Sequence, residues 1–484
     1  MKVVKDTSGY IFTFAPKYDS IIMSKSHFLS LFLLLNLLVP CAKLSAQVLT
    51  LNDAVETGLA NYGSIKAKNN YLNASKATVL QSKKEYLPNL NLSAQQDFGT
   101  INGQNGPLYG LGLSVASSGL PLPHQNWNAA FGALYLTNVN WDFFAFGRAR
   151  ERIQVSQSMV KRDESDLEQE QFQHSIRVAA AYLNLLAAQR LTQSWENNLQ
   201  RAAALKNVVV TRAKNGLIPG VDSSLANAEV SSAKISITQA RDFEQEQANN
   251  LARLMGVTTQ NFVLDTLFIT KMPQSLSDSV LKTENHPVLR YYANRVAVSE
   301  HQARYFQTLG MPTFTAFGVF QGRGAGFSSS YATDQHAYTQ NYFEGIKPVR
   351  ANYLLGIGAT WNLTGILRTR QQVASQSFIS TALKEEYNLA DQQIKNQLLL
   401  AENKIRNAVS NFQEAPVQVR SASDAYLQKS VLYKNGLSNM VDLTQALYIL
   451  NRAETNRDIA LSNLWQALLL KAAAAGDFNI FLNQ

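Results

Sequence analysis

The sequence predicts a mainly α-helical fold with a smaller β portion, built by tandem duplication of one unit. Three observations lead to this prediction: short stretches recur at a constant offset, two very long segments are almost free of helix-breaking residues, and four short segments alternate apolar and polar residues. The 484 residues are 46% hydrophobic and 16% charged, with 12 Pro and 25 Gly, which is typical of ordered, helix-rich protein.

The duplication rests on matches that share one offset of 220 residues. The tetrapeptide KNGL at 214–217 recurs at 434–437, and more distant matches keep the same offset. They are Val221 with Val441, Asp222 with Asp442, Trp141 with Trp361, and Arg148 with Arg368. We therefore expect a single unit over 47–484, with internal repeats at about 48–270 and 286–477.

The front of the chain, residues 1–46, has the order of a secretory signal peptide. A basic residue precedes an apolar run over 28–39, small residues follow, and we expect cleavage after Ala46. The run is too short for a spanning helix, which needs about 20 residues. The mixed prefix suggests that Met23 is the true start. Cys41 raises the alternative of a lipoprotein, which the proline directly before it disfavours.

Long helices are predicted on both sides of the duplication. Residues 148–214 contain no Pro or Gly, and their apolar residues recur at helical spacing. A helix of that length would be about 100 Å long at 1.5 Å per residue. The matching segment 368–434 contains Pro416, which predicts a kink or a local break.

Helices of about half this length are predicted at 49–86, 222–255 and 440–475. Two of them placed end to end would match one long helix, which indicates an elongated antiparallel bundle of coiled-coil helices. Each KNGL turn then joins a long helix to a half-length one. We expect Gly216 and Gly436 to adopt the left-handed conformation that ends the long helices.

Four segments alternate with the period of a strand, and they form two hairpins with long tips at 99–130 and 322–352. The segments are 90–98, 131–142, 313–321 and 353–363. Each has about the 9 to 11 residues that a tilted strand needs to cross a bilayer. Four strands cannot close a membrane β-barrel, and unpaired edges cannot lie in lipid, so we expect the chain to oligomerise. The alternative is a soluble sandwich edge resting on the bundle.

No catalytic centre, cofactor or metal site is predicted. The single cysteine lies in the expected signal peptide, and the six His are scattered without metal-ligand spacing. The glycine-rich stretch at 322–327 lies in a hairpin tip rather than between a strand and a helix, so it does not predict a phosphate loop. The net charge of +9 falls to +6 when the five Lys and two Asp of residues 1–46 are subtracted. The remaining charge is spread over long helices without a basic, aromatic-rich cluster, which argues against nucleic acid as the partner.

Together these features resemble the TolC-like outer membrane efflux proteins. The resemblance covers residues 48–477 and is carried by LTLNDAVETGLANYGSIKAKNNYL at the mature start, WDFFAFGRAR before the long helix and AAAYLNLLAAQ within it. It implies a homotrimer in the outer membrane whose twelve strands form one β-barrel, continued by an α-helical barrel through the periplasm.

The resemblance also implies a function. Such a channel-tunnel has porin activity and is the passive exit duct of a tripartite efflux pump or a type I secretion system, with a gated periplasmic entrance. Its partners would be a periplasmic adaptor protein, an inner-membrane pump and outer membrane lipid. The competing classes are a periplasmic adaptor, for which we see no lipoyl-like β domain, and a secreted structural coiled coil without a pore, which would not need the alternating strands.

For the KNGL turns the resemblance implies docking against the adaptor. The residues concerned are Gly216, Leu217, Gly436 and Leu437. The alternative is that the glycines only end the long helices and meet no partner.

A gate is implied next to these turns. Asp442 matches an aspartate of a ring that controls selectivity, and Gln445 occupies the place of a second ring aspartate. Tyr433 and Asp222 match a latching pair, and Ser438 stands where a latching arginine would be. The ring should therefore carry half the charge, and the latch should be weaker. The alternative is that both aspartates only stabilise the first turn of the returning helices.

Overall fold

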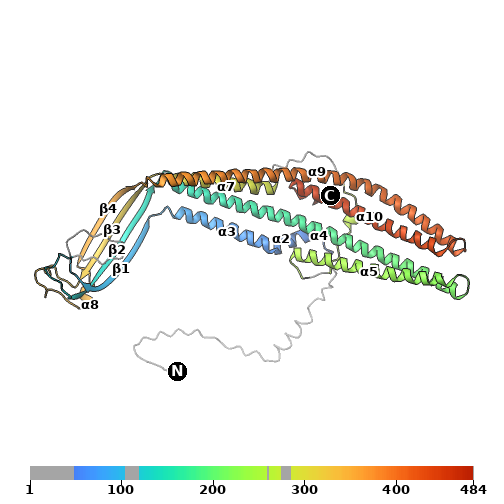
Figure 1. Cartoon of the computed structure of the whole chain (residues 1–484), viewed down its shortest axis with the longest axis horizontal. Coiled ribbons are helices and arrows are strands. Elements are labelled where there is room, and N and C mark those ends of the chain that lie inside the picture. Colours follow the sequence, from blue (N-terminus) through green and yellow to red (C-terminus); the bar gives the residue numbers. More distant parts are fainter. Residues whose placement is uncertain (1–47, 104–118, 259–260, 274–284, 483–484) are drawn as a thin grey trace, which may run out of the picture. The chain divides into compact units, whose positions relative to one another are not determined.

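The computed structural model describes residues 48–103, 119–258, 261–273 and 285–482. The expected signal peptide and the middle of the first hairpin tip lie outside these residues. Residues from Leu49 onward form one compact unit, shown in Figure 1. Its helices are α2 (Leu51–Asn61), α3 (Gly63–Lys84), α4 (Arg148–Lys214), α5 (Gly220–Met255), α6 (Leu267–Thr270), α7 (Pro287–Thr308), α8 (Tyr342–Ile346), α9 (Gly365–Lys434), α10 (Met440–Ala475) and α11 (Asn479–Leu482).

The long helices α4 and α9 have half-length helices along them. Helices α3 and α5 pack on α4, while α7 and α10 pack on α9. The same order of helix, two strands, long helix and half-length helix thus occurs twice in the described residues. Helix α9 runs unbroken through Pro416, so the local break that the sequence allowed is not present. Pro416 is exposed, and the carbonyl that lacks its helical partner can be hydrated there.

The segment before the first strand differs from the prediction, because it is two helices rather than one. Helix α2 begins with a capping box formed by Thr50 and Asp53. At Tyr62 the backbone becomes extended, with φ −66° and ψ 123°, and α3 starts at the next residue. The Tyr62 ring stacks on His174 of α4 at a centroid distance of 3.9 Å, which fixes this break against the long helix.

The strands are β1 (Asn89–Thr100), β2 (Ala129–Phe144), β3 (Thr313–Ala325) and β4 (Arg350–Thr360). They form one antiparallel sheet in the order β1-β2-β3-β4, so both predicted hairpins are confirmed and the β2–β3 pair joins them. Strands β1 and β4 are the two edges. The sheet lies at one end of the long helices, and the KNGL turns lie at the other (Figure 1).

One face of this sheet is apolar across all four strands. In an antiparallel sheet, paired residues point to the same side, so the register assigns each face. The apolar face carries Leu90, Leu92 and Phe98 of β1, Phe131, Val139 and Trp141 of β2, Phe314 and Phe320 of β3, and Tyr353, Leu355 and Ile357 of β4. The opposite face is more polar, with Asn, Ser, Gln, Asp, Thr and Arg side chains beside Leu134, Leu136, Val319 and Leu354.

An aromatic ring also lies on the polar face, at Phe317. It is paired with Gly356, where a Cβ atom would lie 2.5 Å from the Phe317 ring. The missing side chain makes room for the ring, and the ring covers the backbone of the glycine. This explains why Phe residues alternate onto both faces of β3.

The main hydrophobic core lies midway along the bundle. It joins α2, α4, α5, α10 and α11 through Tyr182, Leu185, Leu251, Trp465, Leu468 and Phe481. Between this core and the KNGL turns there are only smaller apolar clusters among the described residues. The core is therefore the main contact between the α4–α5 hairpin and the α9–α10 hairpin.

None of the described helices is both long enough and apolar enough to cross a membrane.

Candidate functional site

The candidate site lies at the two helical tips, where α4 meets α5 and α9 meets α10. Both tips end their long helix in the same way. Gly216 and Gly436 have φ of +68° and +73°, and the next N–H groups, of Leu217 and Leu437, donate to the carbonyls of Arg212 and Leu432 at 3.0 and 2.9 Å. This is the Schellman arrangement, so the predicted role of the glycines in ending the helices is confirmed.

Aliphatic side chains stand exposed at both tips. Leu217 and Leu437 are 66% and 74% exposed, and Val221 and Val441, in the first turns of α5 and α10, are exposed to a similar extent. Each tip therefore presents an exposed leucine and an exposed valine to solvent.

Tyr433, in the last turn of α9, connects the two hairpins. Its ring is 4% exposed and packs on Val209 of α4 and Ala226 of α5. Its hydroxyl donates to Oδ2 of Asp222 at 3.3 Å, so the structure brings together the two residues that were expected to pair. Burial raises the pKa of Tyr433, and the Asp222 carboxylate raises it further, so the phenol remains a neutral donor.

Arg212 adds a second link, which the sequence did not reveal. Its Nη1 donates to the carbonyls of Tyr433 and Lys434 at 3.2 and 3.0 Å, and its guanidinium lies 6.0 Å from the centre of the Tyr433 ring. The last carbonyls of a helix lack intrahelical partners and carry partial negative charge. Arg212 of one hairpin therefore caps the long helix of the other.

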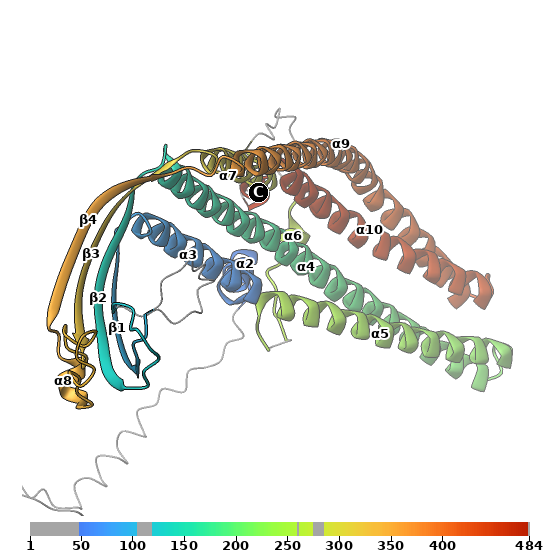
Figure 2. The ribbon, with the colours of Figure 1, turned by 60° about the vertical axis from the view of Figure 1, so that its left-hand side comes forward.

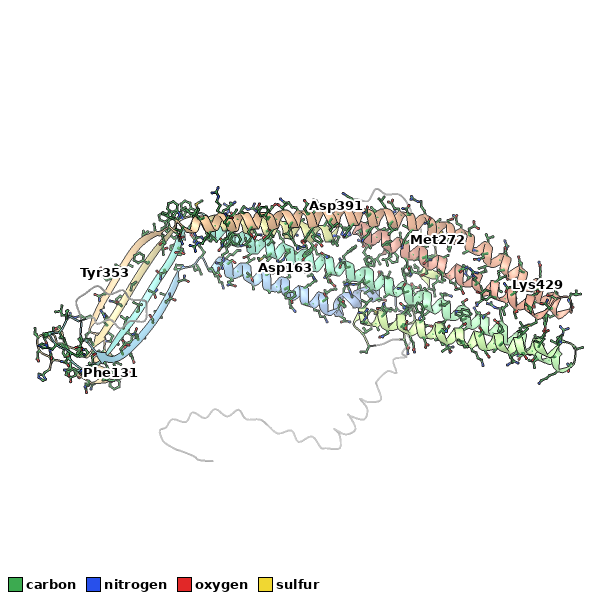
Figure 3. The ribbon with its side chains drawn as sticks, viewed as in Figure 1. Phe131, Asp163, Met272, Tyr353, Asp391 and Lys429 are labelled. Carbon is green, nitrogen blue, oxygen red and sulfur yellow. The ribbon has the colours of Figure 1, made fainter. Side chains whose placement is uncertain are left out.

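Asp442 is held within its own hairpin. Its carboxylate accepts from Lys429 Nζ at 2.9 Å and from Ser438 Oγ at 3.3 Å, and its N–H donates to the side chain of the N-cap residue Asn439 at 2.8 Å. The Lys429 ammonium is the main cause of a lowered pKa for Asp442. Figure 3 shows Lys429 near this tip.

Two consequences follow for the expected ring. The Asp442 charge is balanced by Lys429 in the same chain, and Ser438 contacts Asp442 rather than the other hairpin. Gln445 lies one turn further along α10 and is exposed. In the described part of the chain, no three His, Cys, Asp or Glu side chains are grouped as a metal site would require.

The chain shares its fold with solved outer membrane channels. The chain is similar to the CmeC outer membrane channel of Campylobacter jejuni, with a TM-score of 0.71 and 13% identity over 88% of this chain and 85% of that one. It is similar to the outer membrane protein VceC of Vibrio cholerae, with a TM-score of 0.69 and 16% identity over 88% and 96%. For the MtrE outer membrane channel of Neisseria gonorrhoeae the values are 0.67 and 16%, over 88% and 89%.

The first half of the chain also resembles a known family, that of the outer membrane efflux proteins. Residues 54–257 match this family, and the resemblance seen in the sequence is thereby confirmed. The family consists of channels rather than enzymes, in keeping with the expectation of no catalytic centre. No curated protein matches the sequence significantly.

Proposed function

We propose that three copies of this chain assemble in the outer membrane into an exit duct for an efflux pump or a type I secretion system. The observation that carries this proposal is the sheet: four strands share one exposed apolar face and leave the edges β1 and β4 unpaired. Lipid accepts the apolar face but not the free edges. Pairing β4 of each copy with β1 of the next removes every edge and gives twelve strands.

The helices continue the duct in this proposal. Helices α4 and α9 have 67 and 70 residues and are therefore about 100 Å long. With the half-length helices beside them, each copy contributes two long antiparallel pairs, and three copies enclose a tunnel in the periplasm. The polar sheet face then lines water, because the apolar face is turned outward to lipid.

The tips form the entrance of this tunnel. The exposed leucines at 217 and 437 would meet a periplasmic adaptor, which links the duct to a pump in the inner membrane. Tyr433, Asp222 and Arg212 would hold the two hairpins of each copy together in the closed state. Asp442 and Gln445 would line the mouth, with the charge of Asp442 reduced by Lys429.

Gel mobility tests the assembly. Detergent extracts of outer membranes, loaded without heating, should contain a trimer that boiling converts to the monomer, and the purified trimer should conduct ions in planar bilayers. A soluble, monomeric protein in the periplasm would overturn the proposal and favour a structural coiled coil.

Surface proteolysis tests the orientation. Protease added to intact cells should cut only within the sheet tips, 99–130 and 322–352. Cleavage near Gly216 or Gly436 before the outer membrane is permeabilised would contradict the placement of the helical tips in the periplasm.

A further inference from the structure

We propose that α8 and the residues just after it form an interfacial anchor, which lies on the outer face of the barrel and inserts Phe343 into the headgroup region of the outer leaflet. The inference rests on the proposed function, because it needs the apolar sheet face to be in contact with lipid. It concerns a segment that neither the family match nor the predicted strands include.

The segment is seated on the apolar face of the sheet, at the tip end. The Tyr342 ring meets Phe131 edge-on at 5.1 Å, and the Tyr135 hydroxyl donates to the carbonyl of Ile346 at 3.2 Å. Phe131 and Tyr135 belong to the apolar face by register. Figure 2 shows α8 at this end of β3 and β4, and Figure 3 labels Phe131 there.

Gly324 of β3 provides the seat for this segment. A Cβ atom at Gly324 would lie 2.8 Å from the carbonyl oxygens of Gly345 and Lys347, which no real side chain could tolerate. A Cβ atom at Gly322 would lie at an ordinary contact distance of 3.6 Å from Pro348. Gly324 is therefore the position at which the apolar face leaves room for the backbone of 345–347.

The segment also binds a polar side chain of the apolar face. Gln96 is a polar residue on the apolar face of β1, and an unpaired amide would be costly in lipid. Its Oε1 accepts from the Tyr342 hydroxyl at 2.8 Å, and its Nε2 lies 3.4 Å from the Tyr135 hydroxyl. The docked segment thus satisfies the polar groups beneath it.

The segment also presents exposed apolar side chains to its surroundings. Phe343 is 77% exposed, and Tyr342 and Val349 are exposed beside it. Tyr353 and Leu355 of the neighbouring β4 are exposed on the same face. The charged Glu344 and Lys347 of the segment are also exposed, which suits the headgroup region rather than the hydrocarbon core.

The distance of the segment from the helix end of the sheet matches the thickness of the apolar layer of a membrane. Aromatic residues gather at the helix end of the sheet, where Phe144 lies 6.0 Å from Phe314 and the Trp141 and Trp361 indoles donate to backbone carbonyls. Gly324 lies ten residues beyond Phe314 on β3. At about 3.3 Å per residue and a tilt of about 40°, this is roughly 25 Å along the membrane normal. A membrane barrel has an apolar band of about that height between two aromatic girdles. Helix α8 therefore supplies the outer girdle.

Spin labels can measure the depth of the segment. The only cysteine of the chain is Cys41, so single cysteines at Phe343, Leu355 and Ser329 can be labelled in a Cys41→Ser background. The full-length trimer would be reconstituted in phosphatidylcholine vesicles with a fraction of phosphatidylglycerol, and collisions with oxygen and with a water-soluble nickel chelate would be compared. We expect the label at 343 to be several-fold less accessible to nickel than that at 329, and shallower than that at 355.

The other possible outcomes contradict either the anchor or the proposed function. If 355 is in lipid but 343 is as accessible to nickel as 329, the anchor is wrong and the barrel stands. If 355 is also in water, the proposed function itself fails. Protection of 343 from both reagents would mean that a neighbouring copy covers α8, which also refutes lipid contact.

A matched pair of substitutions tests the seat at Gly324. Gly324→Ala should displace the segment and raise the nickel accessibility of the label at 343 several-fold. Gly358→Ala, in the same sheet, places its Cβ at an ordinary 3.8 Å from Phe317 and should leave it unchanged. Equal accessibility in both variants would show that the glycine seat does not hold α8.

Discussion

Under the proposed assembly, removing one hydroxyl at the tips should loosen the closed entrance. In Tyr433→Phe the ring and its packing remain, but the bond to Asp222 is lost. Such a hydrogen bond contributes about 1 kcal/mol, and its 3.3 Å length places it at the weaker end. If the three copies open together, the effects add to about 3 kcal/mol, which corresponds to a shift on the order of 10²-fold in the ratio of open to closed channels.

Planar bilayer recordings of the purified trimer measure this ratio as the fraction of time in the high-conductance state. Tyr448→Phe is a suitable control, because Tyr448 is an exposed tyrosine of α10. It should behave as the wild type. Arg212→Gln should act in the same direction as Tyr433→Phe, since it removes two bonds between the hairpins. An intact Tyr433→Phe trimer with an unchanged open fraction would refute the latch.

Three further predictions concern the helices. Lys429→Gln leaves the Asp442 carboxylate without its ion pair and should raise the cation selectivity of the channel. Asp442→Asn should lower it. Reversal potentials in a KCl gradient that are the same in both variants as in the wild type would contradict both expectations. Gly436→Val forces a β-branched residue into a left-handed conformation at about 1 to 2 kcal/mol, so dye export should be lost while the trimer persists, and normal export would argue against docking at this tip. Burial lowers the pKa of His174 in the folded protein below its ordinary value of 6.5. As the pH falls below 6.5, His174 is therefore protonated in the unfolded chain before it is protonated in the folded protein. The free energy of unfolding declines over this range, until the pH reaches the pKa of the folded protein. The Tm should therefore drop more in the wild type than in His174→Gln between about pH 7.5 and 5.5, and parallel curves would exclude the imidazole as the cause.

The strands could be predicted closely because their signal is local. Alternation of apolar and polar residues placed all four within a few residues of their observed ends. The five residues of α8 are too few to show a period, and the meaning of Gly324 depends on a segment about twenty residues further along the chain. Only the folded sheet shows that Gly324 makes room for the backbone of Gly345 and Lys347.

At the helical tips, too, local features could be predicted from the sequence and long-range contacts could not. Each turn glycine follows from its neighbours in sequence, whereas the contacts of Arg212 join residues more than two hundred positions apart and bind carbonyls, which every residue carries. Lys429 and Asp442 could have been paired, since they lie seven residues before and six after Gly436 and so face each other across an antiparallel hairpin. Tyr62 shows the reverse error: helical spacing continues through it, but its ring is held by His174 in another helix.

The two free edges of the sheet also affect how the protein is made. A lone chain that entered the bilayer would expose the backbone N–H and C=O groups of β1 and β4 to lipid, at several kcal/mol for each unsatisfied group. Under the proposed assembly, insertion must therefore await or accompany association, and its rate should depend steeply on the supply of chains. A copy with intact helices but a damaged edge strand would join normal copies and spoil the closure of the whole ring, so such alleles should be dominant over the wild type when both are expressed.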